Sequence, residues 1–252
     1  MGIKDDAVDA IRAAREALTH KYVSIPRGDG IREAICAATI ARESAVQAAG
    51  DTERQLLSLA NTIPEVLAGR LRARTTRQAV QICAHWRPER IGDPIASSIA
   101  ATMRSMARRI SNLRTEADQL EQVITSHINR WRPDLLDQYG VGPIVAAAVL
   151  NAWSHPRRIH SPAAFAMLAG CAPIAASSGM TTRHRLNRHG DRQLNRAIHT
   201  IALTRMRRDP KTIAYVERRR QQGKTDREIR RSLKTYIARD LHKLLEKPLD
   251  RT

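Results

Sequence analysis

Apolar residues recur in alternating steps of four and three along one stretch of this chain. They are Ile99, Met103, Met106, Ile110, Leu113, Ala117, Leu120 and Ile124. This spacing, sustained over several heptads, is typical of a coiled coil or of a long seam between two helices. We expect one helix over 97–133, roughly 50 Å long at 1.5 Å per residue, which Pro133 ends. Either it joins copies of the chain as a coiled-coil arm, or it packs within its own domain; the polar residues on its other faces favour the arm.

The segment before this helix, 23–96, is predicted to be a helical linker without chemistry of its own. From Gly30 to Gln47 the apolar residues follow a helical period. Asp51 or Thr52 is expected to cap a second helix, and prolines further on separate shorter helical pieces. The chain as a whole is therefore predicted to be mainly α, with a compact helical domain over 134–252.

The charge balance points to a polyanionic partner. The 252 residues carry a formal charge of +18, which favours nucleic acid over a small acidic substrate. The segment from Arg183 to the C-terminus holds 21 basic and 8 acidic residues, or +13 of that total. Aromatic residues make up only 3% of the chain, so stacking of bases on aromatic side chains is not the expected main mode of binding.

The sequence predicts no membrane partner and a cytoplasmic, nucleoid-associated location. No apolar run approaches the roughly 20 residues that a transmembrane helix needs, and the acidic first residues do not resemble a signal peptide. The three cysteines, Cys36, Cys83 and Cys171, lack the spacing of a zinc site or a disulfide framework. They are expected to be small buried residues in a reducing compartment.

A glycine-containing turn divides two apolar segments near the start of the predicted C-terminal domain. Gly140 and Gly142 stand just before Pro143 and an apolar helix. Such an arrangement has the form of a helix-hairpin-helix, which can hold a DNA phosphate on free backbone N–H groups without recognising its sequence. A simple glycine turn between packed helices is the alternative, and the basic context leaves the two interpretations about even.

A second loop combines serine, glycine and an unusual density of arginine. Ser177, Ser178 and Gly179 follow a helix that Gly170 is expected to end. By itself, serine beside glycine usually marks only a turn, and the chain offers no histidine at a spacing diagnostic of a protease-like pair. The residues predicted to contact phosphates, from charge and position, are Arg183, Arg185, Arg188 and Arg192.

Two carboxylates near the N-terminus share one face of a predicted helix. Asp6 and Asp9 are three residues apart, so both could reach one divalent cation. Spacing alone favours the simpler interpretation, in which acidic residues in a first turn complement the helix dipole.

Several of these motifs, taken in order, resemble one family. They are Gly140-Val141-Gly142-Pro143, Phe165, Leu168-Ala169-Gly170, Ala172-Pro173, Ser178-Gly179, the 185–190 segment and Arg192. The set is similar to the C-terminal transposase domain of the insertion sequence 110 family, relatives of the Piv-type DNA invertases. The resemblance covers about 135–245, and the segment 4–10 is similar to the last acidic motif of that family's N-terminal RuvC-like DEDD domain.

The resemblance implies DNA transposition by strand exchange, guided by an RNA that the mobile element encodes. Ser178 would attack a DNA phosphodiester, because the family's serine directly precedes a glycine. Asp6 and Asp9 would be ligands of Mg²⁺ in the acidic site that assists this attack. The family also places a helical coiled-coil region between the two domains, where this chain has its heptads, so we expect a homo-oligomer formed through that arm.

The same resemblance predicts that this chain holds only part of the family's enzyme. The RuvC-like domain needs about a hundred residues before Asp6, including two earlier acids, so 1–22 is expected to be its remnant and the chain to be a truncated form that is inactive by itself. The alternative is a non-catalytic basic protein, derived from a transposase, that binds DNA or the guide RNA. A nucleoid-binding protein without recombination activity is the third possibility.

Overall fold

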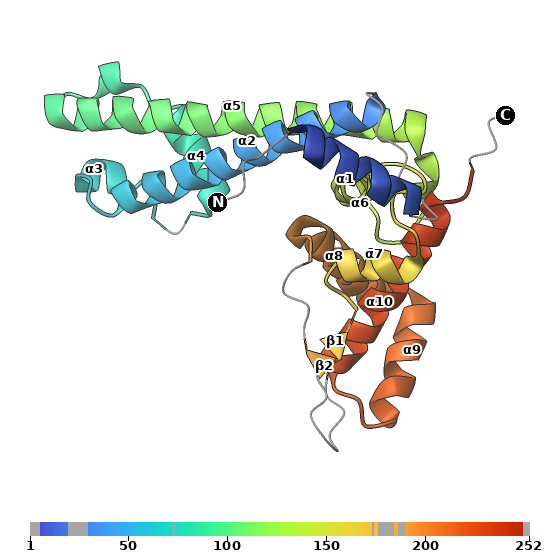
Figure 1. Cartoon of the computed structure of the whole chain (residues 1–252). Coiled ribbons are helices and arrows are strands. Elements are labelled where there is room, and N and C mark those ends of the chain that lie inside the picture. The colour runs from blue at the N-terminus through green and yellow to red at the C-terminus, as the bar shows by residue number, and fades with distance from the viewer. Residues whose placement is uncertain are drawn as a thin grey trace. The chain divides into compact units, whose positions relative to one another are not determined.

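The computed structural model describes residues 6–19, 30–72, 74–172, 174–175, 184–185 and 190–248 (Figure 1). The fold is mainly α, as predicted. The chain divides into two compact units, Gly30–Ala147 and the combination of Met1–Asp29 with Ala148–Thr252. The four functional segments inferred from the sequence, 1–22, 23–96, 97–133 and 134–252, stay predictions. Of the helices in the described ranges, none combines the length and hydropathy needed to cross a bilayer.

A long helical hairpin forms the unit Gly30–Ala147. Its elements are α2 (Ile31–Ala60), α3 (Glu65–Ala68), α4 (Thr76–Ala84), η1 (Pro88–Arg90), α5 (Pro94–Trp131) and η2 (Pro133–Leu135). Helix α5 runs beside α2 (Figure 1). Their ion pairs join Arg42 to Glu121 at 2.8 Å, and Arg114 to Glu53. From Arg42 to Glu53 the residue number on α2 rises, whereas that of the paired residue on α5 falls from Glu121 to Arg114. The two helices are therefore antiparallel.

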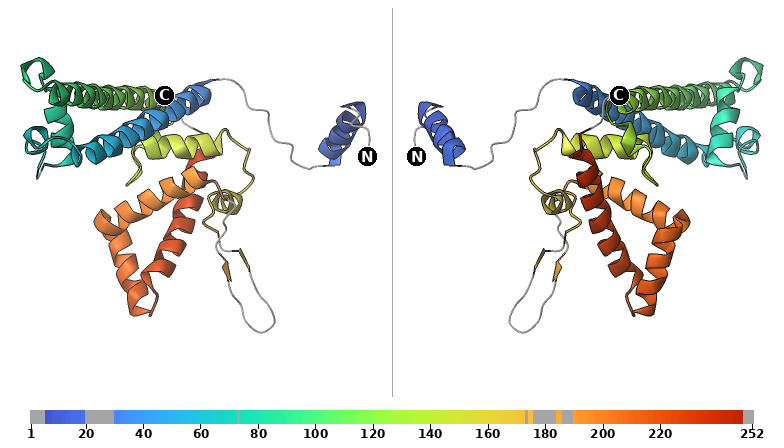
Figure 2. Two further views of the ribbon diagram at one scale, coloured as in Figure 1. Left: turned by 90° about the vertical axis from the view of Figure 1, so that its left-hand side faces the viewer. Right: turned by 90° about the vertical axis from the view of Figure 1, so that its right-hand side faces the viewer.

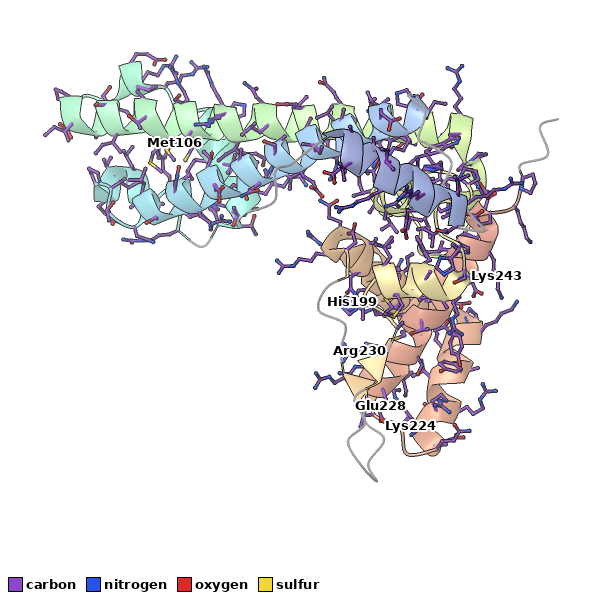
Figure 3. The ribbon with its side chains drawn as sticks, viewed as in Figure 1. Met106, His199, Lys224, Glu228, Arg230 and Lys243 are labelled. Carbon is purple, nitrogen blue, oxygen red and sulfur yellow. The ribbon has the colours of Figure 1, made fainter. Side chains whose placement is uncertain are left out.

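The predicted heptad positions face this intramolecular seam. Met103, Ile110, Ala117 and Ile124 are buried, and the alternate positions are half-buried. Half-buried Met106 belongs to the latter row and packs against a core cluster that α4 also lines (Figure 3). The structure therefore shows the second of the two possibilities, a long helix packed within its own unit. The use of this helix as an arm between copies stays a prediction.

The expected break between two helices near residue 50 is wrong, because α2 continues through it. Thr52 does not cap a helix; its hydroxyl is buried and donates to the carbonyl of Ala48 at 2.8 Å, one turn back. The apolar face of α2 stays in register with α5 on both sides of Gly50. Burial of that face outweighs the weak helix propensity of Gly50 and Asp51, a common result when tertiary packing opposes local preference.

Short loops and side-chain caps join the helices of the unit that contains the C-terminal part. Its elements are α1 (Asp6–Thr19), α7 (Pro162–Leu168), β1 (Ile174–Ala175), β2 (His184–Arg185), α8 (Arg192–Arg208), α9 (Pro210–Gln221) and α10 (Asp226–Leu245), and α6 (Pro143–Trp153) begins in the other unit. Helices α8, α9 and α10 follow one another as the sides of an open triangle (Figure 2). Asp209 ends α8 and caps α9, accepting from Thr212 N at 3.2 Å.

Apolar side chains pack where α8 meets α10. The buried side of α8, predicted to include Leu194, Ala197 and Ile198, is buried in the structure. It meets the apolar face of α10, which includes Ile229 and Leu233. The C-terminal end of α10 is fixed by Glu246, whose carboxylate accepts from the Trp153 indole at 2.8 Å. These contacts hold α7, α8 and α10 together and so fix the ends of the loop that carries the serines.

Candidate nucleic-acid interface

The glycine turn before α6 needs its first glycine more than its second. Gly140 has φ of 82°, the left-handed region that favours glycine. Gly142 is not among the glycines with positive φ, and a Cβ placed on it would meet no atom within 4 Å. Of these two glycines, Gly140 therefore adopts a backbone conformation that favours glycine, and Gly142 does not. The short 3-10 helix η2 precedes this turn, and the use of Gly140 and Gly142 in a DNA-binding hairpin stays a prediction.

A close approach of two glycines fixes the ends of the loop that carries the serines. Gly170 ends α7 with φ of 64°, as predicted for a C-terminal glycine. A Cβ on Gly190 would lie 2.4 Å from Gly170 N and 2.5 Å from Gly170 Cα. The next residue, Asp191, donates its N–H to Leu168 O at 2.7 Å. The chain therefore returns after the loop to the point from which it left.

A two-stranded antiparallel ladder continues from this crossing point. Ile174 pairs with Arg185 and Ala175 with His184. Of the predicted site residues, Ser178 and Arg183 stand in the sequence between these strands and Arg188 follows them, and all three lie outside the described residues. For Arg185 the structure describes the backbone only. The ladder thus defines where the serine segment is attached to the domain.

Arg192 is the first residue of α8 and its side chain is exposed. Asp191 caps this helix, accepting from Leu194 N at 2.9 Å. Exposed or half-buried arginines continue along the triangle, including Arg218, whose guanidinium lies 5.7 Å from the centre of the Tyr215 ring. Arg220, by contrast, is engaged by Asp226 at 2.9 Å. The geometry therefore leaves several cations in positions where a phosphate backbone can reach them.

Sequence analysis missed a polar cluster where α8 meets α10. Lys234 Nζ donates to Asn195 Oδ1 at 2.7 Å, and Asn195 Nδ2 donates to Ala169 O at 2.6 Å. Burial lowers the pKa of Lys234, and burial together with the charges of Lys234 and Arg230 lowers the pKa of His199. Asn195 and His199, the two members on α8, are four residues apart, a spacing that places them on one face of the helix but indicates no particular site. Their partners are supplied by a helix that begins more than twenty residues later, so no local pattern marks the cluster.

Part of this chain is similar to known protein families and proteins. The sequence profile described as "Transposase IS116/IS110/IS902 family" matches residues 134–217. Residues 134–217 are thus similar to IS110-family transposases. The matched residues include the glycine turn, the serine loop, all four predicted phosphate-contacting arginines, Asn195 and His199, whereas Lys234 and the N-terminal acids lie outside them.

Two insertion-element proteins are similar to about half of this chain. One is the uncharacterized 42 kDa protein of insertion element IS900 from Mycobacterium paratuberculosis, 30% identical over 137 residues. The other is the uncharacterized 43.6 kDa protein of insertion element IS110 from Streptomyces coelicolor, 33% identical over 135 residues. The alignments cover 53% and 52% of this chain but only 34% and 30% of those proteins. The chain thus matches about a third of the length of these IS110-family relatives.

The acidic N-terminal motif lies outside the matched residues 134–217. Asp6 is the first residue of α1, and its side chain is not among those described; the exposed carboxylate of Asp9 lies 3.9 Å from the Arg12 guanidinium. Among the described residues, no group of three or more His, Cys, Asp or Glu side chains is arranged to hold a metal ion. Mg²⁺ needs several convergent oxygen ligands, so the described residues by themselves do not fit such a site. The assignment of Asp6 and Asp9 as ligands stays a prediction.

Proposed function

We propose that this chain acts on DNA as the C-terminal part of an insertion-sequence transposase, with Ser178 as the nucleophile. The observation that carries the proposal is the family match over 134–217, which includes Ser178 and its flanking arginines. The structure adds that both ends of the serine segment are anchored to one rigid point, where Gly170 and Gly190 touch. A nucleophile needs such anchoring, because small errors in placement cost large factors in rate.

The proposed step is a transesterification. The Ser178 hydroxyl oxygen forms a bond to the phosphorus of a DNA phosphodiester, and the bond from phosphorus to one sugar oxygen breaks. The serine proton is lost, and the departing sugar oxygen gains one. One phosphoester bond replaces another, so the strand can be rejoined later without an external energy source. Arg183, Arg185, Arg188 and Arg192 are proposed to hold the phosphate, since guanidinium groups bind phosphate oxygens in a bidentate manner.

A second candidate function is binding without catalysis. It is favoured by the basic triangle of α8, α9 and α10, which presents cations such as Arg218 independently of the serine loop. In this case the chain would hold DNA or an RNA of the element, and Ser178 would have no part in its activity. Assembly of copies through α5 is compatible with either candidate.

Trapping of a covalent intermediate tests the proposal. The full chain is incubated with element-end DNA that carries a nick next to the scissile phosphate, both alone and with a separately produced N-terminal domain of an IS110-family relative. We expect an SDS-resistant protein–DNA adduct in at least one of these two arms. Ser178→Ala should abolish the adduct, because the attacking oxygen is removed.

Ser177→Ala is the matched control, since it removes the neighbouring hydroxyl and should leave the adduct intact. An adduct that persists in Ser178→Ala would overturn the assignment of the nucleophile. DNA binding without any adduct, in either arm, would instead support the second candidate.

A further inference from the structure

Lys234 is held in place by a neutral partner. Its ammonium is half-buried and donates to Asn195 Oδ1 at 2.7 Å. The amide of Asn195 is itself fixed by its bond to Ala169 O. Among the described residues, no carboxylate forms an ion pair with Lys234. A cation that has lost part of its hydration is normally paired, so this arrangement leaves its charge uncompensated.

The surroundings increase rather than relieve this excess of positive charge. Burial lowers the pKa of His199, and Lys234 and Arg230 lie close enough to this histidine for their charges to lower its pKa further. The acids of α10 nearest to Lys234 in sequence, Glu228 and Asp240, are each six residues away. Glu228 accepts from Thr225 N at 2.9 Å, and the charge of Asp240 acts on Arg205. The sequence from 138 to 190, which includes α7 and the whole serine loop, contains no Asp or Glu. The segment next to the cluster therefore supplies no carboxylate; the Cys171 thiol, which lies in it, is coupled to Lys234, and burial raises the pKa of this thiol.

The cluster is attached to the base of the serine loop. Thr235, the neighbour of Lys234, donates its hydroxyl to Cys171 O at 2.8 Å. Cys171 follows Gly170, where the returning chain crosses at Gly190, and β1 begins at Ile174. Lys234 and Asn195 thus hold together the end of α7 and the start of α8, which the serine loop connects.

We propose that Lys234, positioned by Asn195 and flanked by His199 and Arg230, binds a phosphate of a nucleic-acid backbone at the base of the serine loop. This assignment rests on the proposed function. It makes Lys234 a phosphate-binding residue at the point where the chain enters and leaves the serine segment. The chemistry recognised is a phosphodiester, and either DNA or RNA supplies it.

The salt dependence of binding tests the assignment in the full chain. Lys234→Gln removes the charge while its amide can still donate to Asn195; Lys243→Gln makes the same change on the exposed part of α10, far along the helix from Arg230 (Figure 3). Affinities for a duplex DNA and for a single-stranded RNA are measured against salt concentration. We expect Lys234→Gln to reduce the log–log slope by about 0.9 on the DNA, or about 0.7 on the RNA, as for one lost phosphate contact.

The nucleic acid for which the slope changes identifies the source of the phosphate. Lys234→Arg, which keeps the charge, should keep the slope. The melting temperature of free Lys234→Gln should be unchanged or higher, because a partly desolvated ammonium has been removed. A slope that is the same in wild type and Lys234→Gln, or that changes equally in Lys243→Gln, would overturn the assignment while leaving the proposed function intact.

Titration of His199 in the wild-type chain provides a test that needs no variant. A bound phosphate beside the cluster favours the imidazolium, so the pKa of His199 measured by NMR should rise on binding. The exposed His160, in the loop before α7, serves as the internal control and should move less. Equal shifts at the two histidines would count against a phosphate at Lys234. A chain that binds neither nucleic acid would overturn the proposed function together with this assignment.

Discussion

Gly190 approaches the backbone of Gly170 so closely that no room is left for a side chain at Gly190. The contact is between backbones, so a larger residue cannot be accommodated by a change of rotamer. It also lies at the point where the serine segment leaves and rejoins the domain. The constraint is thus both structural and, through the loop that it anchors, functional.

Replacement of Gly190 by alanine should therefore be costly. Because its Cβ would lie 2.4 Å from Gly170 N, we expect Gly190→Ala to lower the free energy of unfolding by about 1–3 kcal/mol, as overpacked sites do. Urea denaturation followed by circular dichroism measures the change. Gly142→Ala is the control: nothing lies within 4 Å of its added Cβ, and we expect a change within about 0.5 kcal/mol. Equal costs at the two positions would contradict this account of the crossing point.

Asp209 caps the N-terminus of α9 through hydrogen bonds to Thr212. Its carboxylate accepts from Thr212 N at 3.2 Å and from the Thr212 hydroxyl at 2.5 Å. The hydroxyl bond, followed by the backbone bonds of Thr212 and Lys211 and by the charge of Arg205, lowers the pKa of Asp209. A carboxyl whose pKa is lower in the folded state stabilises the fold above its unfolded pKa, and this contribution is lost as the pH falls through the folded value.

We accordingly expect Asp209→Ala to cost about 1 kcal/mol of unfolding free energy at pH 7, the usual value for a lost N-cap. The difference from wild type should shrink below the folded pKa of Asp209, because the wild type then loses the charge as well. Denaturation at pH 7 and near pH 3 makes the comparison. Asp209→Asn keeps a capping acceptor without the charge, so its smaller deficit at pH 7 should also shrink at low pH. A deficit for Asp209→Ala that is constant with pH would exclude the charge from the capping effect.

At the scale of elements, α5 shows how far a heptad pattern can be interpreted. The pattern predicted a long helix, and the structure has one from Pro94 to Trp131. The residues at every seventh position from Met103 to Ile124 are buried. The pattern requires a partner helix but does not identify it, and the partner in this structure is α2 of the same chain. The pairing joins distant residues, as in the ion pair of Arg42 with Glu121, whose members are 79 residues apart.

Helix α2 illustrates the opposite case, in which a local signal was outweighed. Gly50, Asp51 and Thr52 together are typical of a helix boundary, yet the helix continues through them. Thr52 satisfies its hydroxyl on the preceding turn of its own helix. The cost of one glycine is about 1 kcal/mol, which is small beside the burial of a continuous apolar face along α5. The local sequence indicates the cost of the glycine, but it does not show how much apolar surface α2 buries against α5.

For the whole molecule, the charge of +18 predicts strongly salt-dependent binding to DNA. Each phosphate neutralised releases condensed counterions, so a chain that contacts six to ten phosphates should lose roughly 10³–10⁵ in affinity between 50 and 200 mM salt. Fluorescence anisotropy with duplex DNA, over a series of salt concentrations, measures the slope. The loss should be similar for unrelated DNA sequences if phosphate contacts dominate. An affinity that stays flat over this range would show that the basic residues do not contact the backbone.

Sequence by itself determined the features that depend on neighbouring residues or on their sum. These are the helical fold, the long α5, the stop at Gly170, the net charge and the ordered motifs through which 134–217 resemble the IS110 family. Each arises from local periodicity, from the conformational freedom of one residue or from composition. Tertiary structure decided which helix covers α5, why Gly190 admits no side chain, and that Lys234 lies on Asn195 without a carboxylate. These features join residues that are tens of positions apart, and only the packing of buried faces brings such residues together.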